Sequence, residues 1–168
     1  MWTKQMPFSV LLQESRWKVE FFSGDTATKP DAAYPLVRLG DIVSESRETL
    51  DPQAEPNRVF NYLSLEHIAS HTGDLIGFAP RAGKEIKSRT KVFTEGNILY
   101  GRLRPNLNKV FVADGVLRDG ICSGEFYVLI PDTGKVLSRV LRSILASPFV
   151  RDHIARFVSG AALPRVPI

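Results

Sequence analysis

The ten residues from Tyr100 to Lys109, YGRLRPNLNK, have the most distinctive side-chain chemistry in the sequence. Arginine suits guanine edges and phosphate oxygens, and asparagine suits adenine edges. If this connection between two expected strands is extended, alternate side chains project from one side of it. Those side chains are Arg102, Arg104, Asn106 and Asn108. The pattern favours contact with nucleic acid over the alternative, a polar loop whose asparagines only make turns.

The positive charge of the chain is concentrated around this segment. The 168 residues carry a formal net charge of +4, but residues 81–109 alone hold eight basic and two acidic side chains. The basic ones are Arg81, Lys84, Lys87, Arg89, Lys91, Arg102, Arg104 and Lys109. Such a concentration attracts polyanions, with nucleic acid first among them. A solvated surface without a partner is the alternative.

No motif of a common enzyme class is recognisable. The phosphate loop GxxxxGK[ST], the dinucleotide motif GxGxxG and the nucleophile elbow GxSxG are all missing from the sequence. Cys122 is the single cysteine, which excludes an internal disulfide and a multi-cysteine zinc site. His67 and His71 lie four residues apart, but no third ligand is near them, so a metal site is disfavoured. We therefore expect a protein that is not an enzyme and binds no cofactor.

The elements that must position these residues follow from hydrophobic periodicity. The apolar patterns predict strands at residues 37–43, 60–65, 97–100, 109–113 and 126–130. One helical turn is expected at 66–71, and loops at 23–35 and 44–58. Residues 136–145 and 148–158 have helical spacing, with Ser147 as the N-cap of the second helix and Gly160 at its end. Residues 8–22 are expected to form a short helix or arm.

Five segments in this order resemble the target-recognition domain of type I restriction–modification specificity subunits. They are VRLGDIVSE (37–45), FNYLSLEHIASHTG (60–73), EGNILYGRLRPNLNKV (95–110), DGICSGEFYVLIP (119–131) and LASPFVRDHIARFVSGAALPRV (145–166). The resemblance implies an α+β fold with a curved, mostly β region and a smaller helical lobe. It also implies a domain at residues 36–168, preceded by an arm and linker at 1–35 and without the family's C-terminal spacer helix.

The resemblance implies recognition of one half-site of double-stranded DNA, without catalysis. In an intact system the partners would be a methyltransferase (modification) subunit, which uses S-adenosylmethionine, and a restriction subunit, which uses ATP and magnesium. Without a spacer helix, a truncated or half-length subunit is expected, as a monomer or weak dimer in the cytoplasm with no membrane partner. The helices at 136–158 would need their apolar faces for the β region. There are two alternatives: a recognition domain of a single-chain restriction–methylation enzyme, and a module that binds an acidic protein.

The resemblance also changes the roles expected for the basic residues. YGRLRPNLNK recurs in family members that recognise different sequences, so it is better suited to phosphate contact or loop structure than to base recognition. Its DNA-binding candidates are Tyr100, Arg102, Arg104, Asn106, Asn108 and Lys109. Base recognition is expected from residues 46–59 and 77–92. The candidates there are Arg81, Lys84, Lys87, Arg89 and Lys91, with Arg58 a weaker one.

Overall fold

The computed structural model describes residues 37–155, 157 and 163–166. The fold is α+β, as expected: in the described part of the chain, a series of short strands is followed by two helices. The expected arm at 8–22 and loop at 23–35 lie outside the described residues, as do Val158 and Gly160. Within the described ranges, no helix is long and apolar enough to cross a membrane.

The first sheet has four antiparallel strands in the order β1-β10-β7-β8. Their bounds are β1 Val43–Glu45, β7 Ile98–Gly101, β8 Val110–Val112 and β10 Phe126–Pro131. Tyr127 of β10 lies opposite Tyr100 of β7, which in turn lies opposite Val110 of β8. The sheet therefore places the start of the YGRLRPNLNK segment at the end of a central strand.

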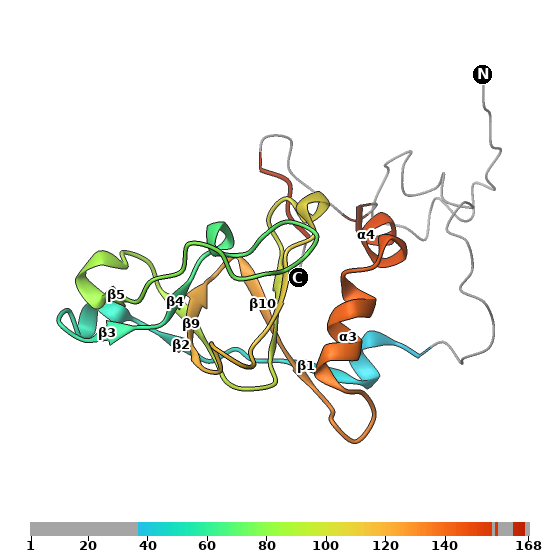
Figure 1. Cartoon of the computed structure of the whole chain (residues 1–168), viewed down its shortest axis with the longest axis horizontal. Coiled ribbons are helices and arrows are strands. Elements are labelled where there is room, and N and C mark those ends of the chain that lie inside the picture. Colours follow the sequence, from blue (N-terminus) through green and yellow to red (C-terminus); the bar gives the residue numbers. More distant parts are fainter. Residues whose placement is uncertain (1–36, 156, 158–162, 167–168) are drawn as a thin grey trace, which may run out of the picture.

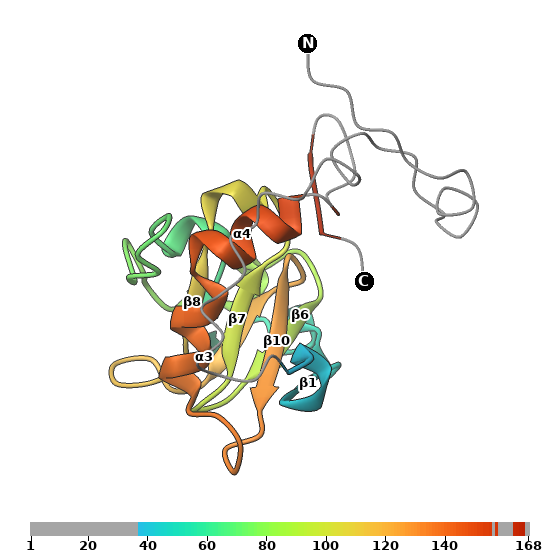
Figure 2. The same ribbon diagram turned by 90° about the vertical axis from the view of Figure 1, so that its right-hand side faces the viewer.

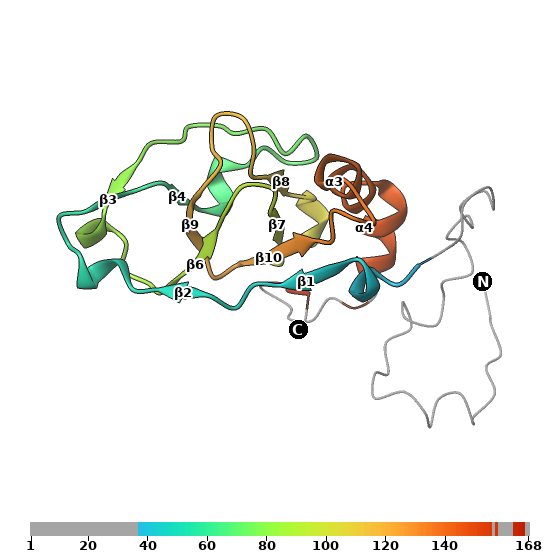
Figure 3. The same cartoon turned by 90° about the horizontal axis from the view of Figure 1, so that it is seen from below.

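The second sheet has the order β2-β6-β9-β4, with β4 parallel to β9 and the other pairs antiparallel. Its strands are β2 Thr49–Leu50, β4 Tyr62–Leu63, β6 Thr90–Phe93 and β9 Gly120–Ser123. A separate antiparallel pair joins β3 (Val59–Phe60) to β5 (Arg81–Ala82). This pair lies at the end of the molecule opposite the helices (Figures 1 and 3).

Two helices, α3 (Ser138–Leu145) and α4 (Pro148–Ala155), cover the first sheet on the face seen in Figure 2. Leu141 and Leu145 pack against Ile98, Tyr100 and Val110 of that sheet. On its other face, Leu99 joins a cluster with residues of the second sheet, such as Phe93 and Leu63. The central strand β7 is thus buried on both faces, which explains its unbroken apolar sequence.

The strands expected at 97–100, 109–113 and 126–130 are confirmed to within a residue or two. The strand expected at 37–43 is wrong, because a helical turn, η1 (Leu39–Asp41), precedes β1. The 60–65 strand is divided at Asn61 between β3 and β4, which belong to different sheets. The first helix starts at Ser138. Its face is less buried than expected, since Leu137, Val140 and Ile144 are exposed.

Candidate nucleic-acid interface

A short helical turn, η3 (Leu65–His67), connects the two halves of the basic segment in space. The Lys109 ammonium donates a hydrogen bond to the carbonyl of Leu65, at 2.7 Å. The Arg81 guanidinium donates to a carboxylate oxygen of Glu66, at 3.3 Å. Residues from β5 and from the loop before β8 therefore meet at one turn, although 28 positions separate them in the sequence.

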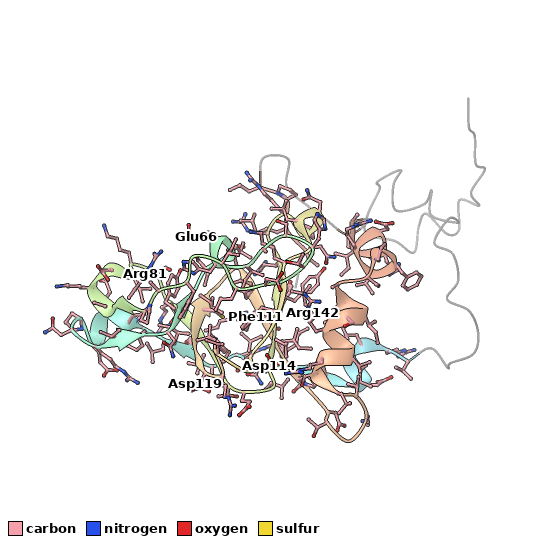
Figure 4. All side chains as sticks on the ribbon, viewed as in Figure 1. Glu66, Arg81, Phe111, Asp114, Asp119 and Arg142 are labelled. Carbon is pink, nitrogen blue, oxygen red and sulfur yellow. The ribbon has the colours of Figure 1, made fainter. Side chains whose placement is uncertain are left out.

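The side chain of Arg81 is held by three neighbours from one short stretch of chain. Besides Glu66, its guanidinium lies 3.4 Å from Nε2 of His67 and 5.8 Å from the centre of the Tyr62 ring. A hydrogen bond from the Ser64 hydroxyl is the main cause that lowers the pKa of Glu66, which stays ionised beside Arg81. Figure 4 shows Glu66 and Arg81 close together. Arg81 is half-buried and oriented, which suits a side chain that makes a directed contact.

His67 serves this cluster as a buried, neutral ring. Its Nδ1 accepts the backbone N–H of Ser64, at 3.1 Å, and the ring packs edge-on against Phe78. Burial lowers its pKa. His71 lies beyond the turn with a φ of 68°, so the two histidines do not share a helix face. In the described part of the chain, no three His, Cys, Asp or Glu side chains come together as metal ligands.

The loop between β5 and β6 presents three exposed cations, Lys84, Lys87 and Arg89. None of them has an ion-pair partner among the described residues. Gly83 keeps this loop close to the chain at residues 52–55, because a Cβ there would lie 2.2 Å from the carbonyl oxygen of Pro52. The side chains of these three cations are therefore available to a ligand, and close packing at Gly83 holds the start of their loop in place.

Two other candidates for base recognition are already occupied. Lys91 forms an ion pair with Glu45 at 3.0 Å, and its side chain is only 17% exposed. It also lies over the Tyr127 ring, so the expectation that Lys91 points toward a base is corrected: it links β6 to β1. Arg58 pairs with Glu55 at 2.9 Å and stacks on Phe60.

The connection after β7 is not extended, which corrects the expected alternation of its side chains. A helical turn, η5 (Pro105–Leu107), interrupts it. Arg104 and Asn108 flank this turn in the left-handed backbone region, with φ values of 50° and 48°. Gly101 lets Leu65 pack closely against the start of this connection, because a Cβ there would lie 2.9 Å from a methyl carbon of Leu65. Side chains two positions apart therefore do not line up on one side.

Only part of this connection faces solvent. Arg104 and Asn106 are exposed, without a side-chain partner among the described residues. Asn108 is buried and donates from its amide to the carbonyl of Ala146, so its expected role in DNA contact is corrected to a structural one. Tyr100 is also buried, and burial raises its pKa to about 12. Arg102 is half-buried over the Tyr127 ring.

Two residues at this site escaped the sequence analysis. Arg165 binds the carboxylate of Glu125 through Nε, at 3.0 Å, and Nη2, at 2.7 Å. This contact is the main cause that lowers the pKa of Glu125. The pair is 40 positions apart, so no local spacing could indicate it. Together they hold a C-terminal segment against the connection that carries Arg104.

A shallow hollow of about 410 Å³ lies between α3, β8 and residues 72–75. Its two arginines already have protein partners: Arg139 binds Asp114 at 2.7 Å, and Arg142 donates to the carbonyl of Val110 at 3.2 Å. Figure 4 shows Asp114 and Arg142 well apart from Glu66 and Arg81. Lys84, Lys87, Arg89 and Arg104 do not line this hollow.

The chain is similar in sequence and in fold to one group of proteins. It is 31% identical over 130 residues to the type I restriction enzyme EcoDI specificity subunit of Escherichia coli. The aligned region covers 77% of this chain and 27% of that protein. No protein-family model matches the sequence. The HsdS subunit from Thermoanaerobacter tengcongensis has 25% identity and a TM-score of 0.67. A chain from a type I R-M system studied for its assembly and conformational transition has 26% identity and a TM-score of 0.69. Each of these two covers 78% of this chain, which spans about a third of their length.

Proposed function

Since the chain belongs to the family of type I restriction–modification specificity subunits, we propose that its domain binds double-stranded DNA at one short sequence, a single half-site. The observation that carries this proposal is the set of exposed cations that form no ion pair with any described residue, Lys84, Lys87, Arg89 and Arg104. They lie on the two connections that η3 joins. Cations that form no internal ion pair are the ones available to phosphate and to base edges.

The two connections have different tasks in this proposal. Arg104 and Asn106 contact phosphates and set the position of the domain on the duplex. Lys84, Lys87 and Arg89, together with the oriented Arg81, reach base edges in the major groove, where each base pair presents a distinct pattern. Arg81 differs from these three, because its Nη2 pairs with Glu66; its side chain is still 40% exposed, so it can contact a base in the direction that Glu66 and the Tyr62 ring set.

The chemistry of the system belongs to other subunits. The domain itself carries no catalytic group and binds no cofactor; a methyltransferase subunit would supply S-adenosylmethionine chemistry, and a restriction subunit would use ATP and magnesium. The domain would direct these partners to its half-site in the cytoplasm. Incubation of the 168-residue chain with labelled S-adenosylmethionine and DNA tests the absence of methyltransferase activity. Methyl transfer above a protein-free blank would contradict it.

Selection of duplexes from a random pool, followed by titration at several salt concentrations, tests the proposed function. We expect one short sequence to be enriched. We also expect the logarithm of the binding constant to fall linearly with the logarithm of salt, because neutralised phosphates release counterions. Salt-dependent binding without any enriched sequence would reduce the role to non-specific DNA binding. Binding that does not respond to salt would reject the electrostatic interface.

A further inference from the structure

Residues 163–166, here called the C-terminal strap, pair with the chain just after β7. The N–H of Arg104 donates to the carbonyl of Pro164, at 2.8 Å, and the N–H of Val166 donates to the carbonyl of Arg102, at 3.0 Å. Leu103 and Arg165 are bridge partners between these two hydrogen bonds. The strap thus acts as a short strand against residues 102–104.

Two side chains of β10 and its preceding turn fasten the strap. Glu125 binds Arg165 through two of its guanidinium nitrogens, and its backbone carbonyl accepts the N–H of Arg102 at 2.9 Å. The Tyr127 hydroxyl donates to the carbonyl of Val166, at 3.0 Å. The Tyr127 ring also lies beneath the guanidinium of Arg102. Glu125 and Tyr127 therefore hold the strap and residues 102–104 together.

The strap binds the backbone of Arg104, which has an unfavourable conformation. Arg104 has a φ of 50°, a conformation that costs free energy for a residue with a side chain and persists only where the surroundings enforce it. Its N–H is bound by the strap, and its carbonyl accepts the N–H of Leu107, which closes η5. The direction of the exposed Arg104 and Asn106 side chains thus depends on contacts made by residues 163–166.

We propose that Glu125 and Arg165 are positioning residues for DNA binding: their ion pair holds the strap, and the strap holds Arg104 and Asn106 in the orientation that meets phosphates. This inference rests on the proposed function. It assigns a role to a carboxylate, although a carboxylate near DNA would be expected to weaken binding through its charge.

The charge of Glu125 and its positioning role have opposite effects on DNA binding, so the Glu125→Gln variant of the full chain distinguishes them. If Glu125 acted only through its charge, neutralising it would tighten duplex binding. If it positions Arg104, we expect binding to weaken about tenfold, the effect of losing one charge-assisted contact. We also expect the salt slope to fall by about one phosphate. Asp119→Asn is the matched control, since Asp119 is exposed, has no ion pair among the described residues and lies outside the segments assigned to DNA contact.

A double-mutant cycle links the effect to Arg104. In a chain that already carries Arg104→Ala, the Glu125→Gln change should have little further effect, because the contact it positions is gone. Tyr127→Phe, which alters no charge, should also weaken binding. Circular dichroism checks that each variant is folded before its binding is compared. Should Glu125→Gln fail to fold, Tyr127→Phe in the same cycle with Arg104→Ala decides the question.

The outcomes separate this inference from the proposed function. If the wild-type chain selects a sequence and responds to salt, but Glu125→Gln binds as tightly as the Asp119→Asn control, the positioning role is rejected and the function stands. Additive effects of Glu125→Gln and Arg104→Ala reject it as well. If the wild-type chain binds no duplex, the proposed function fails first.

Discussion

At the scale of single residues, what distinguishes the candidate cations is whether the protein already uses them. Lys91 forms an ion pair inside the domain, whereas Arg104 and Arg89 form none with the described residues. Arg81 is intermediate, because Glu66 orients it without burying it fully. This difference in occupancy was not visible in the sequence, where all four belong to one basic segment.

Arg104→Ala is expected to weaken binding to every duplex by a similar factor. The side chain is assigned to a phosphate, which is the same in all sequences, so its loss should also reduce the salt slope by about one. Fluorescence anisotropy with the preferred duplex and with an unrelated duplex measures both quantities. A change in the preferred sequence would invert the assignment of the two connections.

Arg89→Ala is expected to act on specificity instead. If its guanidinium makes a bidentate contact with one base, the discrimination at that base position should fall by about 1–3 kcal/mol. Competition binding with duplexes that differ at one base pair at a time locates the position. Lys135→Ala is a suitable control, since Lys135 is paired with Asp132 beside the helical lobe. Loss of affinity without any change in preference would count against base recognition.

His67→Gln should change how stability depends on pH. Because burial lowers the pKa of His67 in the folded chain, the unfolded chain takes up the proton first as the pH falls. The free energy of unfolding should therefore decrease as the pH drops below about 6.5, the ordinary pKa of histidine. Urea denaturation at several pH values tests this, and the variant should show a flatter dependence in that range. An equal slope for both proteins would exclude His67 as the cause.

At the scale of elements, the long apolar runs could be predicted and the short ones could not. The run around Val128 is buried on a central strand, so its own sequence is sufficient evidence. The two-residue strands β2 and β3 are defined by their partners Lys91 and Ala82, which lie far away in the chain. The turn η5 depends on left-handed residues at Arg104 and Asn108, and neither is glycine. Tertiary contacts outweigh local preference at each of these places.

Helix α3 shows the same limit, because periodicity indicates an apolar face but not how much of it is covered. Leu141 is 1% exposed and Val140 is 49% exposed. Leu141→Ala should therefore reduce the free energy of unfolding by about 2–5 kcal/mol, as for a buried leucine. Val140→Ala should change it by no more than about 0.5 kcal/mol. Urea unfolding of the two variants measures the difference, and equal losses would mean that α3 packs differently.

At the scale of the whole molecule, the uneven charge of the chain has a structural counterpart. The basic segment is divided between cations bound to other parts of the domain, such as Lys91 and Lys109, and cations that form no ion pair among the described residues, such as Arg89 and Arg104. The family resemblance predicted the α+β fold. It could not indicate which cations are free, because that depends on carboxylates such as Glu45, Glu66 and Glu125 from other parts of the chain.

The assembly state is the last property to follow from the whole fold. The expectation that the helices use their apolar faces entirely against the sheets is wrong, since Leu137, Val140 and Ile144 are exposed along α3. One stripe on an eight-residue helix is, however, small beside the roughly 1,200–2,000 Å² that a stable protein interface buries. We therefore still expect the 168-residue chain to be a monomer or a weak dimer. Light scattering over a range of concentrations measures this. If a tight dimer forms, Ile144→Asp should dissociate it where α3 is the interface, and a dimer that survives that change would place the assembly surface elsewhere.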